Sequence, residues 1–362
     1  MEVTWVGLFL RGAERRLFLL PERREVEDEM SAATAWLFPG QGSQAVGMGQ
    51  SLHRVSSAAR DVFMIADAVW GGSLAGAMFN GPAEVLQATV VTQPAIVTAS
   101  LAAIAAVREE WEARHGIPLP EPSFVAGHSV GEFAAVVASG ATDVATGLRL
   151  VCERARLMQW AAETNPGSMI AVLGLARDEV EAACALARET VAGSYVSVAN
   201  DNAHVPAQIV IAGDLPGLEV ASAECRERGA RRCVPLTVGG AFHSAAMAPA
   251  QEGLARAIAM APFGDPRVPV IANVTALPLR RARDVRAELA SQVVSPVRWA
   301  ETVTFLAEAG CRRFVEFGQG TVLGNLVQRA IPDAEVHSVG DADGVGRVVD
   351  WLGSRQGGNA NA

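Results

Sequence analysis

The chain has 362 residues, is 50% hydrophobic by count and carries a formal net charge of −9 at pH 7. This length and composition predict one large or two modest domains around a substantial core. The acidic balance argues against general nucleic-acid binding, which needs a basic surface.

The N-terminal segment differs in composition from the rest of the chain. Residues 21–30, PERREVEDEM, are highly charged, so we expect residues 1–30 to be a disordered extension. The apolar run from Trp5 to Leu10 is short and precedes no cleavage pattern, so a signal peptide is not expected. We also expect no apolar run long enough to cross a bilayer, and therefore no membrane partner.

The compact part of the chain begins with a short apolar strand. This strand, Ala35–Phe38, ends in the glycine-rich loop PGQGSQ. A long alanine-rich helix is predicted over about Gln93 to Glu112, with Pro94 in its first turn, where proline is tolerated. A second apolar strand, residues 123–126, then runs through GHSVG into another helix.

The GHSVG stretch, residues 127–131, is the first chemical signal in the chain. A G-x-S-x-G between a strand and a helix is typical of a nucleophile elbow, which exposes the serine oxygen at the helix N-terminus. The alternative is a strand-to-helix turn in which Ser129 only caps the helix. The pattern is short, and on its own it leaves both interpretations open.

A small subdomain is predicted after a helix over about Thr142 to Glu163 and the break at Asn165-Pro166-Gly167. Residues 165–239 predict the order β-α-β-β-α-β, which is ferredoxin-like. The predicted strands are 168–173, 195–199, 208–212 and 232–236, and the helices are 177–189 and 215–228.

Helices and strands alternate again after Gly239-Gly240, up to a last helix that follows FGQGTVL. This alternation predicts a mostly parallel sheet with helices on both faces. The predicted strands are 268–272 and 313–317, and the helices are 285–293 and 299–309. The tail, residues 355–362, is expected to be disordered.

The five cysteines are scattered and contain no C-x-x-C pair. They fit a reducing cytosol and predict neither a disulfide framework nor a metal site. No cofactor is expected.

A serine nucleophile needs a base that takes its proton. Among the six histidines, His128 adjoins the serine, but a neighbour on a tight turn usually points elsewhere. His243 lies in the apolar stretch VGGAFHSAAM and is the better candidate. A buried histidine without a catalytic role is the alternative.

Four motifs occur in the order LFPGQGSQAVGMG, GHSVGEFAA, AFHS and SPVRW. Together they resemble the malonyl-CoA:acyl-carrier-protein transacylases and the acyltransferase domains of fatty acid and polyketide synthases. The resemblance covers about Ala33 to Arg329. It implies an α/β-hydrolase-like core with a parallel sheet, residues 31–164 and 240–354, and an inserted ferredoxin-like subdomain, residues 165–239.

The resemblance also implies roles for individual residues. Ser129 matches the acylated nucleophile and His243 the general base, while the backbone carbonyl of Gln292 orients the imidazole. The backbone amides of Gln41 and Val130 are expected to form the oxyanion hole.

Two further residues bear on the choice of acyl group. Arg154 matches the arginine that pairs with the free carboxylate of malonyl in this family. From the sequence alone, Arg149 and Arg156 on the same helix would serve equally well. Phe242 matches the malonyl pattern, because its ring fills the space of an α-branch; a purely structural role in the core is the alternative.

The resemblance implies that a cytoplasmic monomer transfers malonyl from malonyl-CoA to a holo acyl carrier protein. The alternatives are an acyltransferase for a modified or branched malonyl-type unit, a malonyl-thioester hydrolase, and a catalytically silent docking partner. Two arginine clusters are candidates for steering an acidic carrier protein, although each is equally consistent with a solvated face. They are Arg226, Arg228, Arg231 and Arg232, and Arg280, Arg281, Arg283 and Arg286.

Overall fold

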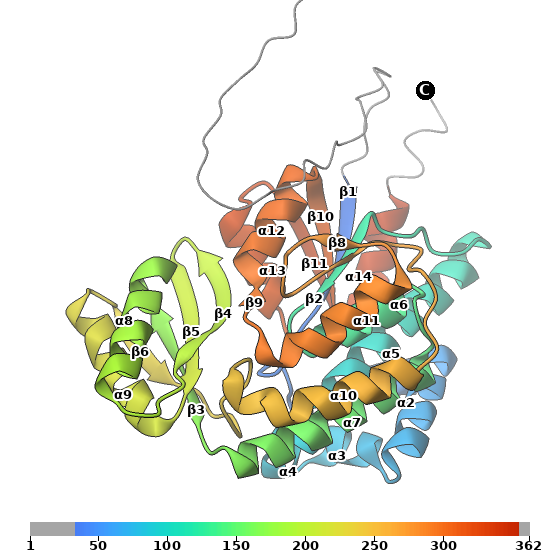
Figure 1. Cartoon of the computed structure of the whole chain (residues 1–362). Coiled ribbons are helices and arrows are strands. Elements are labelled where there is room, and N and C mark those ends of the chain that lie inside the picture. Colours follow the sequence, from blue (N-terminus) through green and yellow to red (C-terminus); the bar gives the residue numbers. More distant parts are fainter. Residues whose placement is uncertain (1–32, 355–362) are drawn as a thin grey trace, which may run out of the picture. The chain divides into compact units, whose positions relative to one another are not determined.

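The computed structural model describes residues 33–354 and shows a mixed α/β structure with two β-sheets (Figure 1). The two segments predicted to be disordered, residues 1–30 and 355–362, lie outside the described residues.

The first sheet has six strands in the order β11-β10-β1-β2-β7-β8. All neighbours from β11 to β7 run parallel, and β8 pairs antiparallel with β7 at one edge. Because the carboxyl ends of parallel strands share one edge, the loops that follow β1 and β2 meet there. These loops carry Gln41 and Ser129. The strands are β1 (Ala33–Phe38), β2 (Phe124–Gly127), β7 (Val270–Ile271), β8 (Pro278–Leu279), β10 (Cys311–Phe317) and β11 (Glu335–Val339).

Helices surround this sheet, and α5, α7, α11 and α12 lie within about four residues of their predicted ranges. They are α1 (Gln50–Val55), α2 (Ser57–Trp70), α3 (Leu74–Asn80), α4 (Ala83–Gln87), α5 (Thr89–His115), α6 (Gly131–Ala138), α7 (Val144–Thr164), α10 (Ala248–Met260), α11 (Ala282–Ser291), α12 (Trp299–Glu308), α13 (Val322–Ala330) and α14 (Ala342–Gly353). Two 3₁₀ turns, η1 (Ala245–Met247) and η2 (Gln292–Val294), complete this set.

Several elements were not predicted. Helices α1 to α4 lie in a stretch with no predicted element, and β11 and α14 follow what was expected to be the last helix. Helices α1, α3 and α4 have only five to seven residues. Isolated helices this short are marginal in water, so their stability comes from packing that no local pattern reveals.

Helix α5 is the centre of the larger core, with buried residues on all its faces. It is long and apolar enough to cross a bilayer, so the expectation that no such run exists is wrong. However, 89% of its most apolar window is buried inside the protein, as in the core helix of a globular protein.

Pro94 lies in the second turn of α5, because this helix begins at Thr89 rather than near Gln93 as expected. A proline has no backbone N–H, so the carbonyl of Val90 lacks its helical donor. The indole Nε1 of Trp70 in α2 donates to that carbonyl at 3.3 Å. This contact satisfies the carbonyl and ties α2 to α5.

The second sheet has five strands in the order β6-β3-β5-β4-β9. Its first four strands come from one continuous segment, in which the elements follow the predicted order β-α-β-β-α-β. Helices α8 and α9 pack against each other and on these strands (Figure 1). The fifth strand, β9 (Val297–Arg298), comes from a later segment and pairs parallel with β4. The other elements are β3 (Ser168–Leu173), α8 (Arg177–Thr190), β4 (Ser197–His204), β5 (Ala207–Gly213), α9 (Leu215–Glu227) and β6 (Arg232–Pro235).

Candidate active site

A sharp turn between β2 and α6 carries Ser129, whose backbone φ of 51° lies in the left-handed region. A Cβ at Gly127 would come within 2.1 Å of the Gly131 carbonyl carbon. A Cβ at Gly131 would come within 2.2 Å of the Phe38 oxygen. Both approaches are too close for any side chain, so the two glycines are what allow a strained serine to stand at this turn.

The Oγ of Ser129 lies 2.7 Å from Nε2 of His243. On the other side of the ring, Nδ1 donates to the backbone carbonyls of Gln292 at 3.0 Å and Ser295 at 3.1 Å. Only the Gln292 carbonyl was expected. Since a carbonyl can only accept, the two oxygens fix the proton on Nδ1 and leave Nε2 free to accept the serine proton.

His243 is buried, with 3% of its surface exposed. Burial, and then the positive charge of Arg154, lower the pKa of its imidazole to about 3. The ring is therefore neutral at physiological pH, which is the form that a general base needs.

His128 points away from this pair, as expected for a neighbour on a tight turn. Its Nε2 lies 2.8 Å from Oδ1 of Asn202 in β4, and burial lowers the pKa of its imidazole.

Arg154, from α7, is 1% exposed and reaches the nucleophile. Its Nη2 donates to Ser129 Oγ at 3.2 Å and to Gln292 Oε1 at 2.9 Å, and its Nη1 donates to Gln93 Oε1 at 2.6 Å. Its Nε has no hydrogen-bond partner, and within residues 33–354 no carboxylate forms an ion pair with it. Burial lowers the pKa of Arg154 to about 9 and Glu132 opposes this, so the guanidinium is charged at neutral pH.

The two other candidate arginines on α7 lie elsewhere. Arg149 donates to the hydroxyl of Thr146, and Arg156 pairs with Glu153 on an exposed face. The geometry therefore selects Arg154 among the three.

A cavity of about 130 Å³ collects the predicted site residues. Ser129, His243, Arg154, Phe242, Gln41 and Val130 all line it. In the described part of the chain, the backbone amides of Gln41 and Val130 donate to no protein acceptor, so both can serve an oxyanion. A Cβ at Gly40 would come 2.6 Å from the His128 oxygen, which explains how the loop after β1 approaches so closely.

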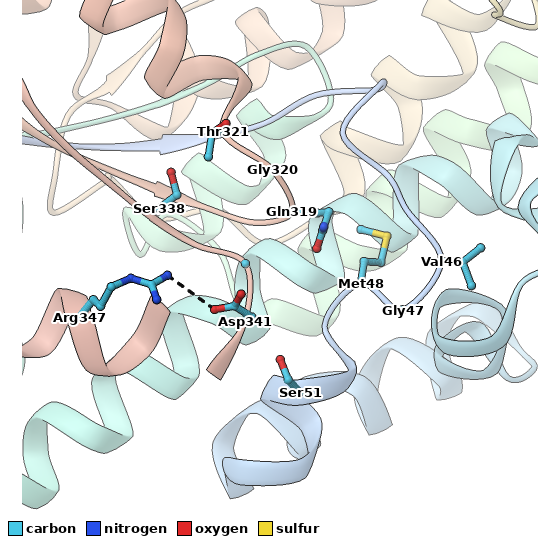
Figure 2. A pocket seen from close by; sticks show the side chains of 11 residues that line it. Val46, Gly47, Met48, Ser51, Gln319, Gly320, Thr321, Ser338, Asp341 and Arg347 are labelled. Carbon is cyan, nitrogen blue, oxygen red and sulfur yellow. Dashed lines mark ion pairs between the residues drawn. The ribbon is translucent and has the colours of Figure 1, made fainter. Parts of the chain in front are cut away.

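A larger cavity, of about 430 Å³, lies near the carboxyl ends of β10 and β11 (Figure 2). Gln319 and Ser338 line it, and Arg347 faces Asp341 there at 3.9 Å. None of the predicted site residues lines this cavity. The chemistry therefore points to the smaller one.

Three polar residues that support the site were not predicted in this role. Asn273 accepts from the Ser129 amide and donates to the Gly127 carbonyl, each at 2.7 Å, so it clamps the turn. Gln93 holds Arg154, and the buried Glu132 contacts the Gln292 side chain. Their sequence signal is weak: each is a polar residue in an apolar stretch, and such residues usually serve packing.

The two arginine clusters are largely exposed, but individual members are already paired. Arg228 binds Glu179 and Glu224, while Arg286 donates to the Ala261 carbonyl and stacks on Phe263. In residues 33–354, no group of three or more His, Cys, Asp or Glu side chains is arranged to hold a metal ion.

Comparisons with known proteins place this arrangement in a family. Residues 35–348 match the family model described as acyl transferase domain. The malonyl CoA-acyl carrier protein transacylase of Bacillus subtilis is 37% identical over 88% of this chain and 96% of its own length. An acyl carrier protein S-malonyltransferase from Vibrio cholerae superposes with a TM-score of 0.80 at 36% identity, covering 88% of this chain and all of that one. A malonyl-transacylase solved in complex with its type II PKS acyl-carrier protein superposes with a TM-score of 0.81 at 35% identity, covering 88% of this chain and 99% of that one. The chain belongs to the acyl transferase domain family.

Proposed function

We propose that the chain transfers a malonyl group from malonyl-CoA to the phosphopantetheine thiol of a holo acyl carrier protein, through an acyl-enzyme on Ser129. The names of its relatives support this reaction. The observation that carries the proposal is the charged guanidinium of Arg154, which is buried 3.2 Å from Ser129 Oγ and forms no ion pair with a carboxylate of residues 33–354.

A malonyl group suits this arrangement because its free carboxylate is separated from the thioester carbonyl by a single carbon. When Ser129 Oγ attacks the carbonyl, the carboxylate can therefore meet the nearby guanidinium. Arginine and carboxylate are both planar and match in hydrogen-bond geometry as well as in charge.

In the first half-reaction, the neutral His243 accepts the hydroxyl proton of Ser129 at Nε2 as Oγ bonds to the thioester carbon. The amides of Gln41 and Val130 donate to the oxyanion that forms. The carbon–sulfur bond then breaks, and the leaving CoA sulfur takes the proton from His243.

The second half-reaction runs in the opposite sense. The carrier protein's thiol gives its proton to His243, and its sulfur attacks the ester carbon of the malonyl-enzyme. The bond to Ser129 Oγ breaks, and Oγ recovers the proton. Both steps are exchanges between similar acyl derivatives, so backbone carbonyls suffice where many hydrolases use a carboxylate to orient the histidine.

Substrate binding also improves the base. The positive charge of Arg154 is one of the causes that lower the pKa of His243. A malonyl carboxylate on Arg154 offsets that charge, so the imidazole becomes more basic once the correct substrate is in place.

Several finer assignments complete the proposal. Within the described residues, we assign 33–164 and 240–354 to an α/β-hydrolase-like core and 165–239 to a ferredoxin-like subdomain, supported by the two sheet topologies. Phe242 restricts the site to unbranched malonyl, supported by its place in the cavity lining. A cytoplasmic location, a monomeric state, and the absence of nucleic-acid and membrane partners stay predictions.

Mixing the protein with malonyl-CoA should add one malonyl mass to Ser129, because the first half-reaction leaves the acyl group there. Intact-mass spectrometry measures this, and Ser129→Ala should abolish it. Adding holo carrier protein should move the label to the carrier. Labelling that survives in Ser129→Ala contradicts the nucleophile assignment, and release to water in preference to the carrier indicates a hydrolase.

The acylation rate should stay flat between pH 8 and pH 5. Because burial lowers the pKa of His243 to about 3, the base keeps its active, deprotonated form over this whole range. An ordinary histidine, with a pKa of about 6.5, would lose most of its activity by pH 5. The measurement is kcat/KM for the malonyl thioester of N-acetylcysteamine, which carries no titrating phosphate. A fall centred near pH 6.5 would show that the base is not desolvated.

Arg154→Ala should lower kcat/KM for malonyl-CoA by roughly two to three orders of magnitude, since the substrate carboxylate loses its buried partner. The same change should leave kcat/KM for acetyl-CoA unchanged or raise it. Arg154→Lys should be a poor substitute, because an ammonium lacks the two-pronged geometry. Arg156→Ala, on the exposed face of the same helix, is the matched control. It should leave kcat/KM unchanged for both malonyl-CoA and acetyl-CoA. An unchanged malonyl-to-acetyl ratio in Arg154→Ala would make the arginine structural.

A further inference from the structure

We propose that the side-chain amide of Gln292 determines acyl specificity, because it holds Arg154 with a neutral oxygen and so leaves the guanidinium charge for the substrate's carboxylate. This inference rests on the proposed function. It gives the Gln292 side chain a role separate from that of its backbone carbonyl, which accepts from His243.

Gln292 is fully buried, and its side chain joins three parts of the site. Its Oε1 accepts from Arg154 Nη2 at 2.9 Å. Its Nε2 donates to the Ser129 carbonyl at 2.9 Å and to the Glu132 carboxyl group. One amide therefore links the arginine to the turn that carries the nucleophile.

The surroundings leave this amide one acceptable orientation. Arg154 has only N–H donors, so it requires the amide oxygen. The Ser129 carbonyl accepts only, and the Glu132 oxygen next to Gln292 also accepts, so both require the NH₂ group. A reversed amide would place donor against donor on one side and acceptor against acceptor on the other.

Glu132 acts on Arg154 only at a distance, by raising the pKa of its guanidinium, and not as an ion-pair partner. No ion pair joins the two among the described residues, and Glu132 is also hydrogen-bonded to Glu288 and to the Asn273 amide. Burial, and then the charge of Glu288, raise the pKa of Glu132 well above its ordinary value, although its hydrogen bonds and the charge of Arg154 oppose this. Arg154 meets three side-chain acceptors, and none of them is a carboxylate: two are the neutral amides of Gln93 and Gln292, and the third is the Ser129 hydroxyl.

The neutrality of these acceptors is what matters for selection. A carboxylate at position 292 would satisfy the guanidinium inside the protein, and a malonyl carboxylate would then meet a site that is already neutral. An apolar side chain would leave the guanidinium held only by Gln93 and by its longer hydrogen bond to the Ser129 hydroxyl. Both changes should therefore slow the acylation of Ser129 by malonyl-CoA more than its acylation by acetyl-CoA.

The test compares Gln292→Glu and Gln292→Leu with the wild type, using kcat/KM for Ser129 acylation by malonyl-CoA and by acetyl-CoA. We expect the malonyl-to-acetyl ratio to fall about a hundredfold in Gln292→Glu and about tenfold in Gln292→Leu. Both variants keep the backbone carbonyl that orients His243 but lose the amide contact to the Ser129 turn, so the result is read from the ratio and not from either rate alone. The ratio does not depend on the fraction of folded protein, and Gln292→Leu carries the test if Gln292→Glu does not fold.

The matched control is Gln319→Glu, which makes the same chemical change in the larger cavity away from the site (Figure 2). It should leave the ratio unchanged. Arg154→Ala is measured in the same series. If it lowers the ratio but the ratio stays at the wild-type value in Gln292→Leu, the Gln292 inference is overturned while the proposed function stands. If Arg154→Ala leaves the ratio unchanged, the proposed carboxylate contact itself fails.

Discussion

The site depends on one buried positive charge, that of Arg154, which forms no ion pair within residues 33–354. Removing a guanidinium from water costs several kcal/mol unless hydrogen bonds and an opposite charge compensate. Here two neutral amide oxygens and the Ser129 hydroxyl meet the donors of Arg154, so its direct contacts supply geometry and no opposite charge. A substrate that brings its own carboxylate completes the site, whereas a neutral acyl group does not.

The same charge links binding to chemistry. Together with burial, it keeps His243 neutral and therefore able to accept a proton. Separate segments of the fold supply this arrangement: α5 carries Gln93, α7 carries Arg154 and η2 carries Gln292. The side chain of Gln292 contacts Arg154, and its backbone carbonyl accepts from His243. The turn after β2 presents Ser129 to all of them.

The sequence predicted those elements that are determined by residues close together in the chain. Gly127 has a steric reason within a few residues, at Gly131, and the alternation of helices and strands indicated the parallel sheet. The steric reason for Gly131 lies at Phe38 on the neighbouring strand, so only the known G-x-S-x-G pattern predicted it. The selection of Arg154 over Arg149 and Arg156 required the family resemblance, because all three occupy one helix. The roles of Asn273 and the Gln292 side chain depend on contacts across 144 and 138 positions of the chain, which no local pattern contains. Similarly, β9 joins the second sheet from a distant segment, so the local pattern of residues 165–239 could not predict it.

The most direct test of this account uses the unmodified protein and changes only the charge of the substrate. Acylation of Ser129 by malonyl-CoA is compared with acylation by the thioester whose free carboxylate is masked as a methyl ester. We expect the methyl ester to react more slowly by roughly two orders of magnitude, because an uncharged ester is a poor partner for the buried guanidinium of Arg154. Equal rates for the two thioesters would contradict the central claim, because Arg154 would then play no part in selecting the acyl group.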